Sequence, residues 1–118
     1  AEQKVAELQP KANYYDMILA NPSLLPISVI AKNYGMSANK MNLLLHDLGV
    51  QYKQGDVWLL YADYQNEGYT HTEMKLWKGS SQMKPNTKWT QKGHIFIYQF
   101  LKMHDTYPTI ETLFEKEA

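Results

Sequence analysis

Polar side chains recur along one short segment of the chain at a spacing that suits contact with nucleic acid. Asn39, Lys40, Asn42 and His46 would project from the outer face of a single helix. The amide of Asn42 has the geometry to pair with adenine in a major groove, and a lysine can bind phosphate. Polar residues are also ordinary on a solvated helix face. The segment therefore predicts either a recognition surface or a simple exposed face.

Two short helices are expected to position these side chains. Ala31 is small enough for a close crossing of two helices, and Gly35 can take the positive φ that a sharp turn requires. Ser28 and Ser37 are the expected N-caps of the two helices, and Gly49 is expected to end the second. These residues predict a helix-turn-helix, with an ordinary helical hairpin in a protein core as the alternative.

Within this unit, residues 28–48, the apolar side chains fall on one stripe. The expected inner side chains are those of Ile30, Tyr34, Met41, Leu44, Leu45 and Leu48. The expected outer side chains are those of Asn39, Lys40, Asn42, Leu43 and His46. The outer set is the candidate surface for DNA or for a protein partner.

A small β-hairpin is predicted directly after these helices. Residues 50–53 and 57–60 are rich in strand-forming side chains, and Gly55 between them permits a tight turn. A winged helix would have its wing or its sheet at this place. Residues 61–67 are expected to form one or two helical turns, which Gly68 stops.

A second hairpin is expected between Tyr69 and Trp89. Threonine and apolar residues alternate with charged or aromatic ones along its first half, and residues 78–81 would supply its turn. Thr90 is the expected N-cap of a long final helix that continues to about His104.

Two further segments are predicted to be helical from their apolar residues. Within residues 3–20, apolar side chains recur at near-helical spacing, and Pro10 is expected to break the helix. These side chains are those of Val5, Leu8, Ala12, Tyr15, Ile18 and Leu19. The final helix is apolar nearly all the way round, at Ile95, Phe96, Ile97, Tyr98, Phe100, Leu101 and Met103. We expect a core helix wrapped by the hairpins and the first helix, with a contact to another protein as the alternative.

The composition fits one α+β domain with a core of its own. The chain has 118 residues, of which 44% are hydrophobic. Cysteine is absent from the sequence, which rules out disulfides and thiolate metal sites and fits a reducing cytoplasm. We find no signal peptide and no long apolar run, so we expect no membrane insertion. Because the sequence begins with Ala rather than Met, we expect a piece of a longer protein.

The charges are unevenly spread although their sum is zero. Residues 68–104 hold six lysines against the single acid Glu73, while both ends of the chain lean acidic. This basic segment suits either a nucleic-acid surface or a solvated lysine face. All twelve basic residues are lysine. Since arginine makes the commonest specific contact with guanine, the composition argues against strong base reading.

Side chains that could carry catalysis are scattered. The histidines show no metal-ligand spacing, and His71 with Glu73 would supply only two ligands. Ser80 and Ser81 lack the glycine elbow of a serine nucleophile, and Gly79 stands outside any phosphate-binding run. We therefore expect neither enzyme activity nor a metal or cofactor.

Several segments together resemble the C-terminal KilA-C domain of phage antirepressor proteins. The resemblance covers roughly residues 8–112 and is carried by residues 10–16, 30–38, 49–53, 58–61, 68–70 and 87–93. Its most specific part is the run Thr87-Lys88-Trp89-Thr90-Gln91-Lys92-Gly93. Family members often have a basic residue after this run, whereas His94 stands there in this chain. A phosphate contact at His94 would therefore depend on pH.

The resemblance implies a winged-helix-like domain that relieves the repression of lytic genes in a bacterial host cell. It places the domain at residues 10–118, and residues 1–9 at the end of a linker helix from a missing N-terminal region. Such a region is a separate module, for example of BRO type. The implied partners are the phage repressor protein, double-stranded DNA, or both. A further alternative is that this domain serves as an oligomerisation module for the missing N-terminal domain.

Two binding mechanisms remain open from the sequence. Either the domain binds the repressor and keeps it from its operator, or its helix enters a major groove while lysines bind phosphates. The residues expected to bind DNA or the partner are Ser37, Asn39, Lys40, Asn42, Leu43, His46, Lys53, Lys75, Lys78, Lys84, Lys88 and Lys92.

Overall fold

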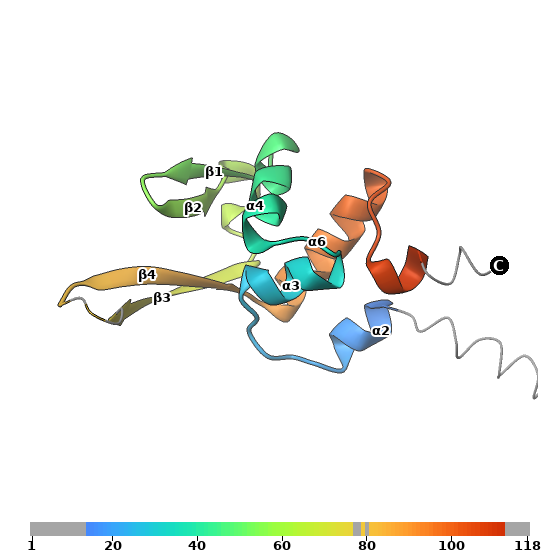
Figure 1. The fold of residues 1–118 in the computed structure, drawn as a ribbon, viewed down its shortest axis with the longest axis horizontal. Coiled ribbons are helices and arrows are strands. Elements are labelled where there is room, and N and C mark those ends of the chain that lie inside the picture. Colours follow the sequence, from blue (N-terminus) through green and yellow to red (C-terminus); the bar gives the residue numbers. More distant parts are fainter. Residues whose placement is uncertain (1–13, 77–78, 80, 113–118) are drawn as a thin grey trace, which may run out of the picture.

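A computed structural model describes residues 14–76, 79 and 81–112, which form an α+β fold (Figure 1). The helices are α2 (Tyr14–Leu19), α3 (Ile27–Asn33), α4 (Ala38–Asp47), α5 (Ala62–Gln65) and α6 (Gln91–Met103). The strands are β1 (Gln51–Gln54), β2 (Val57–Leu60), β3 (Thr70–Leu76) and β4 (Met83–Trp89). Residues 109–112 add a last helical turn. The expected mixture of helices with small hairpins is confirmed.

The turn between α3 and α4 has most of the expected features. Gly35 has a φ of 70°, and the Ser37 hydroxyl accepts a hydrogen bond from the Lys40 backbone N–H at 3.1 Å. The prediction that Ser28 caps α3 was wrong. The helix begins one residue earlier, at Ile27, with Pro26 at the N-cap. Proline fixes φ near the value that an entering chain needs, so the helix starts there without a side-chain cap.

Three helices end in the same hydrogen-bonded arrangement, a Schellman motif. At the end of α4, Gly49 donates to the His46 carbonyl and Val50 to the Leu45 carbonyl. The same pair of bonds ends α3 at Gly35 and α6 at Asp105. Asp105 has a φ of 58°, a left-handed conformation that glycine takes more easily.

The inner side chains of α3 and α4 form the main core, as predicted. The buried members are Ile30, Ala31, Tyr34, Met41, Leu45, Val50, Trp89, Ile97 and Leu101. Leu44 and Leu48 pack against this cluster. In α2, Tyr14 and Ile18 are buried, whereas Leu19, one of the apolar residues at near-helical spacing, is 47% exposed. This short helix contacts α6 through one side only, so fewer of its apolar residues are covered.

Each hairpin is a separate two-stranded antiparallel sheet. In β1–β2, Gln54 pairs with Val57 across a two-residue turn, in which Gly55 has a φ of 64°. In β3–β4, Thr70 pairs with Trp89 and Leu76 with Met83. Both hairpins project from the same side of the helices (Figure 1). The predicted turn of the second hairpin lies partly outside the described residues.

Helix α6 runs through the middle of the fold, as its apolar sequence indicates. Its buried residues are Gly93, His94, Ile97, Tyr98 and Leu101. On a neighbouring side, Phe96 stacks on Tyr69 with ring centroids 4.3 Å apart. Met103, expected inside, is 78% exposed because it occupies the last turn. None of the helices in the described residues is long and apolar enough to span a bilayer.

Candidate functional site

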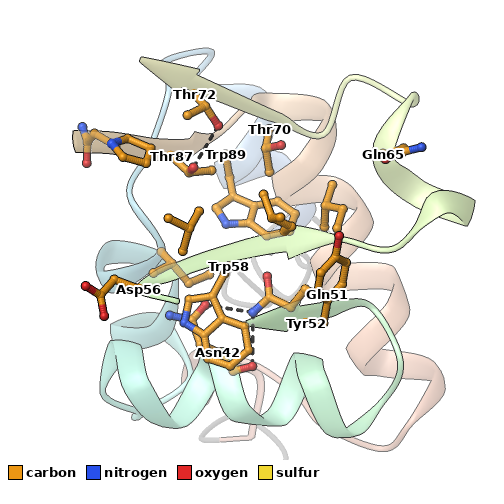
Figure 2. Close-up of a pocket in the computed structure, with 16 residues that line it drawn as sticks. Asn42, Gln51, Tyr52, Asp56, Trp58, Gln65, Thr70, Thr72, Thr87 and Trp89 are labelled. Atoms are coloured by element: carbon orange, nitrogen blue, oxygen red, sulfur yellow. Dashed lines mark hydrogen bonds between the residues drawn. The ribbon is translucent and has the colours of Figure 1, made fainter. Parts of the chain in front are cut away.

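A groove of about 480 Å³ lies between the two hairpins. All four residues of β2 line one side of it, and residues from β3 and β4 line the opposite side (Figure 2). The residues from the second hairpin are Thr70, Thr72, Pro85, Asn86, Thr87 and Trp89. On this wall the hydroxyls of Thr72 and Thr87 are hydrogen bonded to each other at 2.8 Å. The wall is therefore uncharged and polar.

The outer face of α4 meets β1 at the floor of this groove through Gln51. The Gln51 side-chain amide donates to the side-chain oxygen of Asn42 at 3.0 Å and to its backbone carbonyl at 3.1 Å (Figure 2). Nδ1 of His46 lies 3.0 Å from the Gln51 carbonyl oxygen. Gln51 is only 3% exposed. The side-chain oxygen of Asn42 and one ring nitrogen of His46 are therefore engaged within the fold.

Trp58 is the central aromatic residue on the β2 side of the groove. Its ring centroid lies 6.0 Å from that of His46, and Nζ of Lys53 lies 5.8 Å from it. Lys53 is its cross-strand partner. An aromatic ring flanked by a cation and partly exposed is a common anchor for a protein partner.

The rest of the α4 surface is exposed. Asn39, Lys40 and Leu43 lie open to solvent, whereas the Ser37 hydroxyl is already bonded to the helix it caps. Of the polar side chains expected to face outward, those of Asn39 and Lys40 make no hydrogen bond within the described residues. Lys40 and Asn39 thus present one free cation and one free amide to a partner.

The lysines of the second hairpin lie on the face that points away from the groove. Cross-strand partners share a face, so His71 and Lys88 lie on the same side of the hairpin as Lys75 and Lys84. The acid Glu73 lies among them, with its carboxylate 3.5 Å from the His71 ring. Lys78 lies outside the described residues.

The opposite face of the same hairpin continues the groove wall and ends in apolar side chains. Met74, Leu76 and Met83 are each more than half exposed there. Lys92 belongs to neither face of the hairpin. Its ammonium lies 3.9 Å from a Glu67 oxygen and 5.7 Å from the ring centroid of Tyr69.

The structure thus brings Asn42 to the groove, with His46 and Lys53 beside the ring of Trp58. Lys75, Lys84 and Lys88 lie on the far face of the second hairpin. Sequence reasoning missed Gln51 and Trp58. A polar residue at the start of an apolar strand, directly after a helix, was the available signal for Gln51. Nothing in the sequence indicated that the two hairpins would enclose a groove.

The model of one protein family, the phage antirepressor protein KilAC domain, matches residues 2–104. The chain belongs to this family. Neither the curated proteins nor the solved structures gave a match. Within the described part of this KilAC domain, no three acidic or histidine side chains gather as metal ligands would.

The most specific run of the KilAC resemblance, residues 87–93, forms a structural joint. The Thr90 hydroxyl accepts from the Gly93 N–H and donates to the Gly68 carbonyl at 2.7 Å. The Gln91 amide donates to the carbonyls of Ile18 and Leu19 at the end of α2. At Gly93, a Cβ atom would clash with the Tyr69 carbonyl oxygen. The run holds α6 against α2 and the start of β3, so much of it serves the fold.

His94, which follows this run in the KilAC domain, is buried. The Asn33 side chain donates to the Tyr14 hydroxyl at 2.9 Å, and that hydroxyl lies 2.7 Å from Nε2 of His94. Tyr14 thus links Asn33 to His94 inside the fold. Burial lowers the pKa of His94 to about 4. The imidazole is therefore neutral at pH 7 and covered, which removes it as a phosphate contact.

Proposed function

We propose that this chain acts in phage antirepression by binding the phage repressor protein, without a catalytic step. The regulatory setting comes from the family to which the chain belongs. In that setting the domain acts in the cytoplasm of the bacterial host. The groove between the hairpins is the proposed contact surface.

The observation that carries this proposal is the engagement of α4 by Gln51. A base-reading helix needs free amides and cations, but the Asn42 oxygen and His46 Nδ1 are bonded to Gln51. Next to them the groove offers a tryptophan, an uncharged threonine wall and exposed apolar residues beyond it. Aromatic residues and methionine are enriched at protein interfaces. The combination favours a protein partner over a base-pair target.

The test is a binding measurement between this chain and the repressor of the same phage. We expect a stoichiometric complex that elutes as one species at micromolar concentration. The control is the chain mixed with operator DNA alone. Separate elution of chain and repressor at micromolar concentration would rule out direct binding by this domain.

DNA binding is the second candidate, and the lysine-bearing face of the second hairpin favours it. In this alternative, α3 and α4 act as a helix-turn-helix with the hairpins as wings, and Lys75, Lys84 and Lys88 bind phosphates. Affinity for DNA should then fall steeply with salt, by a slope of about 0.9 per phosphate neutralised.

A double variant tests the phosphate contacts. Lys75→Ala with Lys88→Ala should reduce the salt slope by about one for each lysine removed. The control is Lys102→Ala, on α6 and away from both hairpins. Absence of a DNA signal at low salt would leave repressor binding as the better account.

A further inference from the structure

Two nearly buried side chains in the groove each keep one polar atom without a partner. Gln51 and Trp89 both line the groove, and each is only 3% exposed. The Gln51 side-chain amide donates twice to Asn42, which leaves its oxygen, Oε1, as an acceptor. The indole N–H of Trp89 is a donor. No hydrogen bond engages either of these two atoms in the described part of the chain.

Both atoms open into the groove and are not sealed inside the protein. Among the described residues, the Tyr34 hydroxyl is the only enclosed side-chain polar atom without a hydrogen bond. Gln51 Oε1 and Trp89 Nε1 therefore keep contact with solvent, and the groove is the hollow that both residues line. Figure 2 shows the Gln51 amide between the rings of Trp58 and Trp89. A partner that fills the groove expels the water that satisfies these atoms.

The two atoms determine what the partner must bring to the groove. Because Gln51 and Trp89 are almost covered, only a narrow group reaches them, such as the tip of a side chain. An apolar tip would leave the Gln51 oxygen and the Trp89 N–H buried and unpaired, which weakens binding. A tip that donates one hydrogen bond and accepts another satisfies both.

The groove also disfavours a charged tip. Of the 16 described residues that line it, only Asp56 is charged, and it lies exposed in the β1–β2 turn. Lys75, Lys84 and Lys88 lie on the other face of the second hairpin. An ammonium or carboxylate deep in the groove would lose its water without gaining a counter-charge. A carboxamide, the side-chain group of Asn and Gln, is neutral and has a donor and an acceptor at one end.

We propose that the groove binds an uncharged segment of the repressor and recognises the carboxamide side chain of one Asn or Gln in it. The amide of that side chain donates to Gln51 Oε1, and its oxygen accepts from the indole N–H of Trp89. The proposal rests on the repressor binding proposed above and adds the chemistry that the groove selects. A site with buried polar groups rejects partners that leave them unpaired, so this contact supplies specificity.

Matched glutamine variants test the acceptor. Gln51→Met removes Oε1 inside the groove, and Gln54→Met makes the same change at an exposed position outside the groove lining. We expect Gln51→Met to weaken repressor binding by at least about tenfold, because the partner's amide then lacks an acceptor. Gln54→Met should change binding by less than about twofold. Circular dichroism verifies that both variants fold.

The wild-type chain tests the donor without any substitution that could disturb the fold. By NMR, the indole N–H of Trp89 should exchange with water at least about tenfold more slowly in the repressor complex than in the free chain. The backbone N–H of Trp89 already donates to the Leu25 carbonyl at 2.7 Å, so its exchange should be slow in both states. Trp89→Phe assigns the indole signal. A purely structural role of Trp89 would leave the indole exchange unchanged.

The chemistry of the partner is tested by changing the repressor. Each exposed Asn is replaced by Asp and each exposed Gln by Glu, which keeps the shape of the side chain and removes its donor. At one position we expect binding to weaken by at least about tenfold, because an oxygen would then face Gln51 Oε1. The same substitutions at the other positions are the matched controls and should change binding by less than about twofold.

The outcomes separate this proposal from the proposed function. Weaker binding of Gln51→Met, slower exchange at the Trp89 indole and one sensitive Asn or Gln together support it. Full binding by Gln51→Met, unchanged indole exchange, or a repressor without a sensitive Asn or Gln overturns it while repressor binding stands. If the wild-type chain binds no repressor, or fills its groove with a second copy of itself, both the proposed partner and this recognition fail.

Discussion

At the scale of residues, Gln51 changes what the surface of α4 can do. The sequence shows Asn42 and His46 as outward polar groups on a helix. In the fold, the side-chain amide of Gln51 donates to Asn42, and the backbone carbonyl oxygen of Gln51 lies at hydrogen-bond distance from His46 Nδ1. The sequence pattern could locate the helix face but not this contact, because the contact depends on how β1 returns along α4. The Asn42 side-chain oxygen and His46 Nδ1 are thus already engaged, whereas the side chains of Asn39 and Lys40 make no hydrogen bond within the described residues.

A second residue-scale consequence concerns His94 and pH. The pKa of His94 is about 4 in the folded chain, below its ordinary value of 6.5, because of burial. Between those values the unfolded chain binds more protons than the folded one. The free energy of unfolding should therefore fall as pH decreases from about 6.5 towards 4, by up to about 1.4 kcal/mol per pH unit.

Denaturant unfolding across this range measures the effect. His94→Gln should flatten the slope, and His104→Gln, at an exposed position, should keep it. Equal slopes in the wild type and His94→Gln would contradict the assignment to His94.

Replacing aspartate by glycine should have opposite effects on the stability of the chain at Asp105 and at Asp47. The φ of 58° at Asp105 is costly for an L residue, so Asp105→Gly should stabilise the chain by about 1 kcal/mol. Asp47 ends α4 with helical geometry, and there Asp→Gly should destabilise by a few tenths to about 1 kcal/mol. Chemical denaturation distinguishes the two, and a loss of stability in Asp105→Gly would be inconsistent with the strained conformation.

At the scale of elements, local signals predicted most of the fold. Glycines at turns, caps at Ser37 and Thr90, and strand alternation predicted both hairpins and the helices between them. The predictions that failed depend on tertiary contacts or on competing local geometry. Pro26 took the place of Ser28 at the start of α3. In α2, Tyr14 is buried and Leu19 is exposed. The groove joins residues from both hairpins, so no local pattern could predict it.

The joint at residues 87–93 is tested by Gly93→Ala. Alanine normally stabilises a helix interior by about 1 kcal/mol relative to glycine. Here its Cβ would clash with the Tyr69 carbonyl and lie 2.9 Å from a Trp89 ring carbon. We expect a net loss of about 2–3 kcal/mol in the free energy of unfolding. Lys92→Ala, at the neighbouring exposed position, should change it by less than about 0.5 kcal/mol. A stabilised Gly93→Ala variant would disprove the close contact.

At the scale of the whole molecule, the two hairpins leave the helical part on one side (Figure 1). The proposed contact surface is the groove between them. The domain belongs to the KilAC family. Its groove and apolar hairpin face suit a protein. Antirepression by this domain would then consist of occupying the repressor, so that the operator becomes free.

One titration tests this central claim most directly. The chain is added to the repressor of the same phage bound to labelled operator DNA, at moderate salt. The account predicts that free operator appears in proportion to the chain added, together with a chain–repressor complex that contains no DNA. Retention of the repressor on the operator, or direct binding of the chain to operator in the absence of repressor, would contradict it.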